Sequence, residues 1–313
     1  MSADSWKLSI PCTRAEAEAV AADIAPLAML EPPPVLMVTE PDEDQPDRWD
    51  LIAYFDAEPD AETIRLVSAL APSAGAIAAT LERLPDADWV TLSQAGIEPV
   101  SAGRFYVHTS TNAGAIPAGA KPFVIEAGLA FGTGQHQTTA GCLEMLDGLR
   151  TKGAVFRHLL DLGTGTGLLA FAALHLWPRA RAIASDIDPI SIDVTRDNAL
   201  ANAVTIGGGP GALELVVADG MEHGRLIARA PYDLIIANIL AGPLVAMAPQ
   251  IAAALHEGGS LILAGLLDSQ ADQVAHAYRR QGLRLAGRID KGDWPTLRMV
   301  KRRRVTRPSA IRP

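Results

Sequence analysis

Cysteine is scarce in this chain of 313 residues, which has two, Cys12 and Cys142, far apart in the sequence. Two distant cysteines give neither the density of a disulfide-stabilised scaffold nor the spacing of a metal site. We therefore expect a protein of a reducing compartment, the cytoplasm, with no bound metal.

Long apolar runs are also lacking. The longest, residues 168–177, contains His175 and is far shorter than the roughly 20 residues needed to span a bilayer. No basic patch followed by an apolar run is found near Met1, so we expect no secretory signal and no membrane partner. The length is ample for two domains.

Positive charge is sparse in the first hundred residues, where nineteen Asp or Glu face five Lys or Arg, against a net charge of −9 for the whole chain. Such a region repels nucleic acid and attracts basic partners. The alternative is an acidic surface that only aids solubility. The basic run 301–304 is interpreted as a solvated strand end and tail, so no direct contact with nucleic acid is expected.

The first 110 residues are predicted to form a small α+β domain. The order β-α-β-β-α-β is typical of a ferredoxin-like sandwich. The predicted strands cover residues 6–10, 35–39, 49–55 and 104–108, and the helices cover 13–25 and 60–84, the second broken near Pro72. Thr13 and Glu16 have the spacing of a capping box at the start of the first helix.

Residues 111–124 are rich in Gly, Ala and Pro and are predicted to be a linker. Beyond them, short apolar runs alternate with stretches of helical pattern, which indicates an α/β domain with a mostly parallel sheet covered on both faces. This larger domain is predicted over 125–305, with a tail at 306–313. Its predicted strands are 156–161, 181–185, 213–217, 234–237 and 260–263.

A glycine loop, Gly163-Thr164-Gly165-Thr166-Gly167, follows the first strand of the larger domain. Glycines there allow a tight turn and let a ligand approach the backbone closely. In a dinucleotide-binding fingerprint the third glycine would fall at Leu168. The spacing found, with Asp161 before it, resembles the first motif of class I methyltransferases, whose cofactor is S-adenosylmethionine.

Acidic residues follow the next two strands. Asp186 can accept hydrogen bonds from both ribose hydroxyls of a nucleoside, as it could in a dinucleotide site. Asp188 is less favoured, because it can cap the helix that starts at Pro189. In the methyltransferase layout Asp219 lies beside the adenine. The glycine loop, Asp186 and Asp219 all lie at the carboxyl edge of the predicted sheet, where open α/β folds bind ligands.

Asn238 follows the fourth strand, where a carboxamide can hold an acceptor nitrogen in line with the methyl group. DNA adenine methyltransferases carry Asn or Asp, two prolines and an aromatic residue at this place. Here Ile239-Leu240-Ala241 follows instead, so a flipped base would have nothing to stack on. The alternative interpretation is that Asn238 is a turn residue.

Upstream of the glycine loop lies Phe131-Gly132-Thr133-Gly134-Gln135-His136-Gln137-Thr138-Thr139, a loop that either wraps a ligand or caps a helix. This segment, D-L-G-T-G-T-G, D-I-D-P and A-N-I-L-A together resemble the ribosomal protein L11 methyltransferase family. The resemblance covers the whole chain, including Gly292-Asp293-Trp294 before the last strand.

The resemblance implies a protein methyltransferase that trimethylates lysine side chains and the α-amino group of the large-subunit ribosomal protein L11, a basic cargo suited to an acidic substrate-recognition domain. His136 is interpreted as a structural residue of its loop. Phe131 would lie over the cofactor, and Asp219 and Gly165 are added from the general methyltransferase layout. The implied cofactor contacts are Thr139, Gly163, Asp186 and Asn238.

Methyl transfer to an amine requires the amine to be neutral, and a free lysine with a pKa near 10.4 is neutral in only a few parts in ten thousand at pH 7. Desolvation would lower that pKa, so no strong base is needed, and Asn238 is predicted to orient the amine. The alternatives are a lysine methyltransferase for another protein, a small-molecule methyltransferase and a non-catalytic cofactor-binding module. We expect a monomer.

Overall fold

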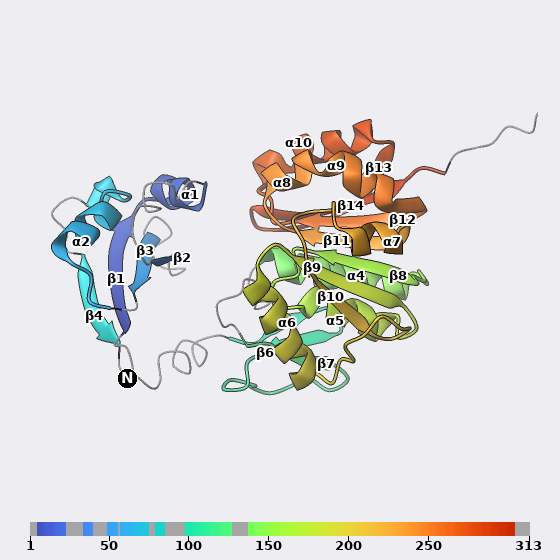
Figure 1. Cartoon of the computed structure of the whole chain (residues 1–313), viewed down its shortest axis with the longest axis horizontal. Helices are drawn as coiled ribbons and strands as arrows, with labels where there is room; N and C mark the ends of the chain where they lie inside the picture. The colour runs from blue at the N-terminus through green and yellow to red at the C-terminus, as the bar shows by residue number, and fades with distance from the viewer. Residues whose placement is uncertain are drawn as a thin grey trace, which may run out of the picture. The chain divides into compact units, whose positions relative to one another are not determined.

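The computed structural model describes residues 5–22, 34–39, 49–55, 57–74, 79–84, 98–126 and 137–303. The chain divides into two compact units, Met1–Leu92 and Ser93–Pro313, and each is considered by itself (Figure 1). The boundary lies earlier in the chain than the predicted residue 110.

The smaller unit contains an antiparallel sheet with the strand order β2-β3-β1-β4 among its described residues. This order and the sequence of elements are those of a ferredoxin-like sandwich, as predicted. Leu8 and Leu51 on the sheet and Val67 on a helix are fully buried in its core. The elements are β1 (Ser5–Cys12), α1 (Arg14–Ala22), β2 (Val35–Thr39), β3 (Trp49–Phe55), α2 (Ala61–Ser68), η2 (Pro72–Ala74) and β4 (Thr80–Leu84).

One predicted helix is wrong in its second half. Residues 60–84 were expected to be helical, but α2 ends at Ser68 and residues 80–84 form the edge strand β4. Leu81 of this strand pairs with Leu8 of β1 and packs against the core. Pairing with β1 therefore overrides the helical pattern, and β4, not residues 104–108, is the last strand of this sheet.

The larger unit is built on a seven-stranded sheet in the described part of the chain, with the order β10-β9-β8-β11-β12-β14-β13. The first five of these strands run parallel, and β14 is antiparallel to both neighbours. This arrangement confirms the predicted α/β class. The strands are β8 (His158–Leu162), β9 (Arg181–Asp186), β10 (Leu213–Val217), β11 (Tyr232–Asn238), β12 (Leu255–Ala264), β13 (Leu283–Lys291) and β14 (Trp294–Lys301).

Helices cover both faces of this sheet (Figure 1). Neighbouring strand residues point to opposite faces, so Leu159 belongs to one core and Leu160 to the other. The first core takes in α4 (Gln137–Thr151), α5 (Leu168–Leu176) and α6 (Pro189–Ala201). The second takes in α7 (Gly224–Arg229), α8 (Ala241–Ala246), α9 (Ala248–Ala254) and α10 (Asp268–Arg280).

Residues 111–124 are not a linker between the units. Their last four residues form β7 (Lys121–Val124), which joins β5 (Val100–Ala102) and β6 (Phe105–His108) in a small sheet of the larger unit. The ring of Phe123 lies 5.9 Å from that of Phe105 and 6.4 Å from that of Phe171 in α5, measured between centroids. The Gly- and Pro-rich composition therefore marks the loop from β6 to β7.

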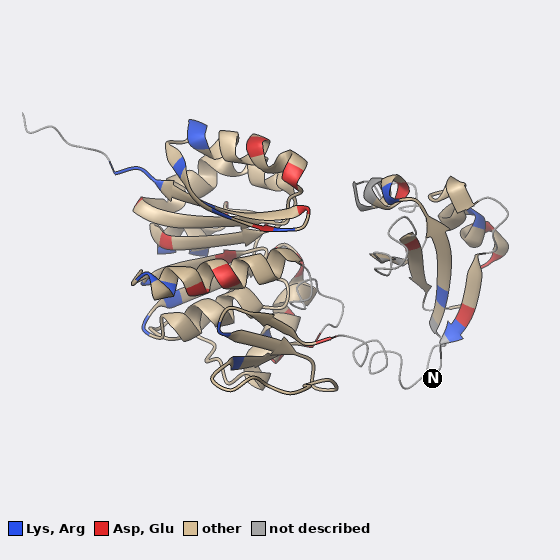
Figure 2. Ribbon diagram, turned by 180° about the vertical axis from the view of Figure 1, so that it is seen from behind, with Lys and Arg blue, Asp and Glu red and all other residues tan. Residues whose placement is uncertain are grey.

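Acidic and basic residues both occur in each unit (Figure 2). The acidic segment 40–47 lies outside the described residues. In the basic run 301–304, Lys301 donates hydrogen bonds of 2.7 Å to the carbonyl groups of Ala252 and Leu255 at the end of α9. This lysine therefore stabilises a helix terminus, while Arg302 and Arg303 are exposed.

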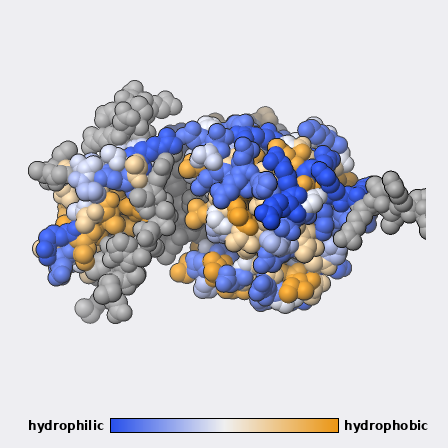
Figure 3. All heavy atoms as spheres, turned by 90° about the horizontal axis from the view of Figure 1, so that it is seen from above, coloured by the Kyte–Doolittle hydropathy of each residue, from blue (hydrophilic) through white to orange (hydrophobic). Residues whose placement is uncertain are grey.

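Hydrophobic residues on the face of the molecule drawn in Figure 3 form small areas between hydrophilic ones. Among the described residues, no helix combines the length and apolar character that crossing a membrane would require.

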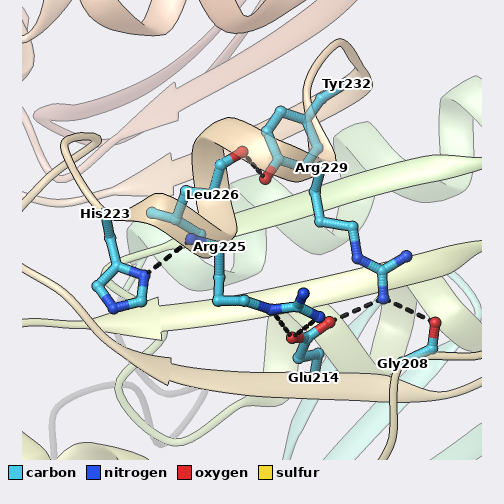
Figure 4. Close-up of polar contacts among 7 residues, drawn as sticks. All are labelled: Gly208, Glu214, His223, Arg225, Leu226, Arg229 and Tyr232. Atoms are coloured by element: carbon cyan, nitrogen blue, oxygen red, sulfur yellow. Dashed lines mark hydrogen bonds and ion pairs between the residues drawn. The ribbon is translucent and has the colours of Figure 1, made fainter.

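An ion-pair network fixes helix α7 to the edge strand β10 (Figure 4). The Glu214 carboxylate accepts hydrogen bonds of 2.6 Å from Arg225 Nε and 2.7 Å from Arg229 Nη2. The Tyr232 hydroxyl donates to the carbonyl of Leu226, 2.8 Å away, and ties α7 to β11. Partial burial raises the pKa of Glu214, but the two guanidinium groups outweigh it and hold this pKa below its ordinary value.

We expect Glu214→Gln to lower Tm by several degrees at pH 7, and the free energy of unfolding by about 1–3 kcal/mol, because Arg229 loses its anionic partner. A carboxyl group whose pKa is lower in the folded chain than in the unfolded chain stabilises the fold at pH values above its unfolded pKa. This stabilisation is lost as the pH falls through the folded pKa. The difference in Tm from wild type should therefore shrink below pH 4. The exposed Glu222→Gln serves as the control, and an equal loss in both variants would contradict this account.

Candidate active site

The glycine loop connects β8 to α5 in left-handed conformations, with φ of 72° at Gly163, 56° at Gly165 and 86° at Gly167. Residues other than glycine rarely adopt such φ values. The amides of Gly163 and Thr164 both donate to the carbonyl of Ser185, at 2.8 and 3.0 Å. The loop is therefore held by the end of the neighbouring strand β9.

The Asp186 side chain ends β9 and faces this loop. Its Oδ2 accepts a hydrogen bond of 2.9 Å from the amide of Gly165, and its Oδ1 accepts one of 3.1 Å from the amide of Asp188. Each carboxylate oxygen can accept a second hydrogen bond. The carboxylate is thus fixed in position and still has the capacity to receive two ribose hydroxyls.

Asp188 has the capping role that the sequence offered as its alternative. Its Oδ1 accepts from the amide of Ile190 at 2.9 Å, and Pro189 occupies the first turn of α6. The two acidic residues after β9 therefore differ in function, since Asp188 begins the helix and Asp186 faces the glycine loop.

Asn238 ends β11 and lies beside α4. Its Nδ2 donates to Oγ1 of Thr139, 3.3 Å away, although the two residues are 99 positions apart. Thr139 is buried in the first turn of α4. The Oδ1 atom of Asn238 is buried and accepts no hydrogen bond from any described residue, so its capacity as an acceptor is unused by the part of the chain that the structure describes.

A pocket brings together three of the predicted residues, Thr139, Gly163 and Asn238. The sequence reasoning missed the other residues that line it, although three of them stand in or directly after the glycine motif. These further residues are Thr164, Thr166, Leu168 and Leu169.

Of the remaining predicted residues, Asp219 is exposed just beyond the end of β10. The preceding amide, of Ala218, donates to the carbonyl of Asp186 at 2.8 Å, so the two acidic residues end neighbouring strands. Phe131 and His136 lie outside the described residues.

Asp161 is buried directly beneath the glycine loop. Its Oδ2 accepts hydrogen bonds from Thr164 Oγ1 at 2.8 Å and from the amide of Ala170 at 3.1 Å. Its Oδ1 has no partner among the described residues. Burial, with a smaller contribution from the nearby charge of Asp186, raises the pKa of Asp161, the two hydrogen bonds lower it, and the net result is a pKa of about 7. Asp161 is therefore a support of the loop that releases its proton near neutral pH.

The site contains donors and acceptors suited to a nucleoside-bearing cofactor. The fixed carboxylate of Asp186 fits a ribose, and the unpartnered Oδ1 of Asn238 fits a polar group beside the glycine loop. In the described ranges no group of three or more His, Cys, Asp or Glu could hold a metal ion. The residues present thus fit S-adenosylmethionine, the cofactor that the sequence resemblance implies.

Gly163→Ala should weaken binding of S-adenosylhomocysteine by more than about tenfold. A Cβ atom at this position would lie 2.3 Å from Cγ2 of Ile239, on a backbone with φ of +72°. Isothermal titration calorimetry measures the affinity. Gly148→Ala in α4 is the matched control, since a Cβ there meets nothing within 4 Å. Wild-type affinity in Gly163→Ala would show that the ligand does not depend on this loop.

Asp161→Asn should become more stable relative to wild type as pH rises. The unfolded chain releases the Asp161 proton near pH 4 and the folded chain near pH 7. Between these values only the folded state holds the proton, so the wild-type free energy of unfolding decreases by up to about 1.4 kcal/mol per pH unit. Urea denaturation from pH 4 to 8 tests this, with exposed Asp272→Asn as the control. A stability gap independent of pH would refute the raised pKa.

Comparison with known proteins finds the same family that the sequence motifs resemble. The family model described as ribosomal protein L11 methyltransferase (PrmA) matches residues 5–302. The ribosomal protein L11 methyltransferase of Agrobacterium fabrum is 41% identical over 267 residues, covering 85% of this chain and 89% of the relative. The Rhizobium meliloti protein of the same name is 39% identical over 290 residues, covering 92% of this chain and 97% of the relative.

Among solved structures, the ribosomal protein L11 methylase of Lactobacillus delbrueckii subsp. bulgaricus is 25% identical, with a TM-score of 0.55. The match covers 66% of this chain and all of that one. The family model spans nearly the whole sequence, and each of the two sequence relatives is identical to this chain at about two fifths of the aligned residues. The chain therefore belongs to the ribosomal protein L11 methyltransferase family.

Proposed function

We propose that this protein is an S-adenosylmethionine-dependent methyltransferase that modifies lysine side chains and the α-amino group of ribosomal protein L11. One observation carries the proposal: the Asn238 carboxamide, held by Thr139, lies beside the glycine loop in the same pocket and keeps a free acceptor. Family membership over residues 5–302 supports the substrate.

Four residues would hold the cofactor. Asp186 would accept the ribose hydroxyls with the lone pairs that Gly165 and Asp188 leave free. The backbone at Gly163 and the side chain of Thr139 line the pocket and would contact the cofactor there. Asp219 is proposed to receive the adenine amine from its exposed position. When bound, S-adenosylmethionine supplies a methyl group on a positively charged sulfur.

The protein's own part in the reaction is to position the amine and exclude water. A lysine side chain must lose its proton before it can attack, and partial desolvation lowers its pKa. In the first two transfers, in which the neutral amine still carries a hydrogen, Asn238 Oδ1 would accept a hydrogen bond from it and leave the lone pair of the nitrogen free to point at the methyl group. The Thr139 hydroxyl fixes the carboxamide through Nδ2. This arrangement needs no strong base.

The smaller unit is proposed to recognise the substrate. Its ferredoxin-like sandwich contributes no residue to the pocket that the structure describes, and the first hundred residues carry the acidic excess that suits a basic ribosomal protein. The proposal further includes trimethylation, a monomeric enzyme, action in the cytoplasm and recognition of protein rather than nucleic acid.

Mass spectrometry of unmethylated L11 incubated with the enzyme and S-adenosylmethionine tests the proposal. We expect L11 to gain whole methyl groups on lysines and on its N-terminus. If labelled cofactor and a whole-cell lysate instead mark a different protein, the L11 assignment is wrong. Label found only in small molecules would refute a protein substrate, and no transfer at all would indicate a binding module.

Asn238→Ala should lower kcat by about 100-fold or more with saturating cofactor, because the amine loses its orienting acceptor. S-adenosylhomocysteine should still bind, since Asp186 and Gly163 are unchanged. Steady-state kinetics and calorimetry measure the two effects separately. Full turnover in this variant would mean that Asn238 does not position the acceptor.

A further inference from the structure

Helix α6 directs polar side chains inward. Thr195 and Asn198 are 0% and 1% exposed, whereas Ile190 and Leu200 of the same helix are 49% and 83% exposed. Buried polar groups require partners, and for Thr195 and Asn198 the partners are backbone groups of the glycine loop and of the residues just after β7. Hydrogen bonding to backbone groups therefore explains why α6 buries polar side chains beside the apolar Ile192 and Ala199.

The Asn198 carboxamide joins two segments that are far apart in the sequence. Its Nδ2 donates to the carbonyl of Thr166 in the glycine loop at 3.1 Å. Its Oδ1 accepts from the amide of Glu126, just after β7, also at 3.1 Å. One turn earlier, the hydroxyl of Thr195 donates to the carbonyl of Gly165 at 2.8 Å.

We infer that Asn198, assisted by Thr195, is a positioning residue for cofactor binding, acting through the backbone of the glycine loop. This inference rests on the proposed function, since it assumes that the loop binds S-adenosylmethionine. Asn198 does not line the pocket. It acts on Thr166, which does, and Thr195 acts on Gly165, whose amide holds the Asp186 carboxylate.

The orientation of two peptide groups is what these side chains control. The amide of Gly165 donates to the Asp186 carboxylate, and the carbonyl of Gly165 accepts from the Thr195 hydroxyl. The Thr166 carbonyl is held by Asn198, which turns this acceptor toward α6. If Asn198 no longer donated, the Thr166 carbonyl would lose this buried hydrogen bond, and the loop would shift in response.

If α6 only stabilised the fold, any substitution that weakens its packing would affect cofactor binding equally. Asn202 distinguishes this role from a positioning role of Asn198. Its Oδ1 accepts from the amide of Val124 at 2.9 Å, and its Nδ2 donates to the carbonyl of Val124 at 2.6 Å. Asn202 therefore fixes β7 to the same helix, but it has no hydrogen bond to the glycine loop among those found.

The test compares Asn198→Asp with Asn202→Asp in the full chain. Each replaces a carboxamide donor by a carboxylate oxygen opposite a backbone carbonyl, one turn apart. For Asn198→Asp we expect the Kd of S-adenosylhomocysteine and the KM of S-adenosylmethionine to rise about 10- to 100-fold. The kcat at saturating cofactor should stay within about threefold of wild type. Asn202→Asp should lower Tm and leave both affinities unchanged.

Equal losses of affinity in the two variants, or wild-type affinity in Asn198→Asp, would overturn the inference. If Asn198→Asp does not fold, Thr195→Val gives the answer, because it keeps the shape and removes only the hydroxyl; a rise in Kd supports the inference and an unchanged Kd contradicts it. Wild-type protein and Asp186→Ala are measured alongside. Absence of binding by the wild type would instead refute the proposed function.

Discussion

The hydrogen bond between the Gly165 amide and the Asp186 carboxylate joins the glycine loop to the end of β9 in the candidate site. Gly163 and Thr164 add two further bonds to the carbonyl of Ser185, the residue before Asp186. Three bonds thus attach the glycine loop to the last two residues of β9. Because β8 is paired with β9 in parallel register over the whole length of β8, the loop and the carboxylate have a fixed separation before any ligand arrives. Such preorganisation reduces the entropy lost on binding.

The other wall of the site depends on sheet topology rather than on local sequence. In a parallel sheet the carboxyl ends of all strands meet at one edge, so β8, β9, β10 and β11 bring the glycine loop, Asp186, Asp219 and Asn238 to that edge. Helix α4 adds Thr139, which contacts Asn238 across 99 residues of sequence. The buried residue beneath this edge is polar as well, since Asp161 accepts hydrogen bonds from the Thr164 hydroxyl and from the amide of Ala170 in the first turn of α5.

Patterns with a local physical cause were predictable from the sequence. Thr13 and Glu16 form the expected capping bonds at the start of α1, Asp188 caps α6, and the glycine spacing gave the left-handed loop. Each of the five strands predicted for the larger domain overlaps a strand of the sheet. These features depend on residues a few positions apart.

Features that depend on distant partners were not predictable in the same way. Residues 80–84 have a helical pattern, and only pairing with β1 makes them a strand. Residues 111–124 have the composition of a linker, yet their last four residues pair with β6 and pack on α5. The inward polar side chains of α6 are understandable only once the glycine loop lies against them. The stretch that contains Phe131 lies outside the described residues, so its role stays a prediction.

A crystal structure of the protein with S-adenosylhomocysteine tests the central claim most directly. The account predicts both ribose hydroxyls within about 2.5–3.0 Å of the Asp186 oxygens, while the Gly165 amide keeps its bond to Oδ2. A nucleoside bound away from the carboxyl ends of β8 and β9, or an Asp186 side chain that turns away from Gly165 on binding, would contradict it.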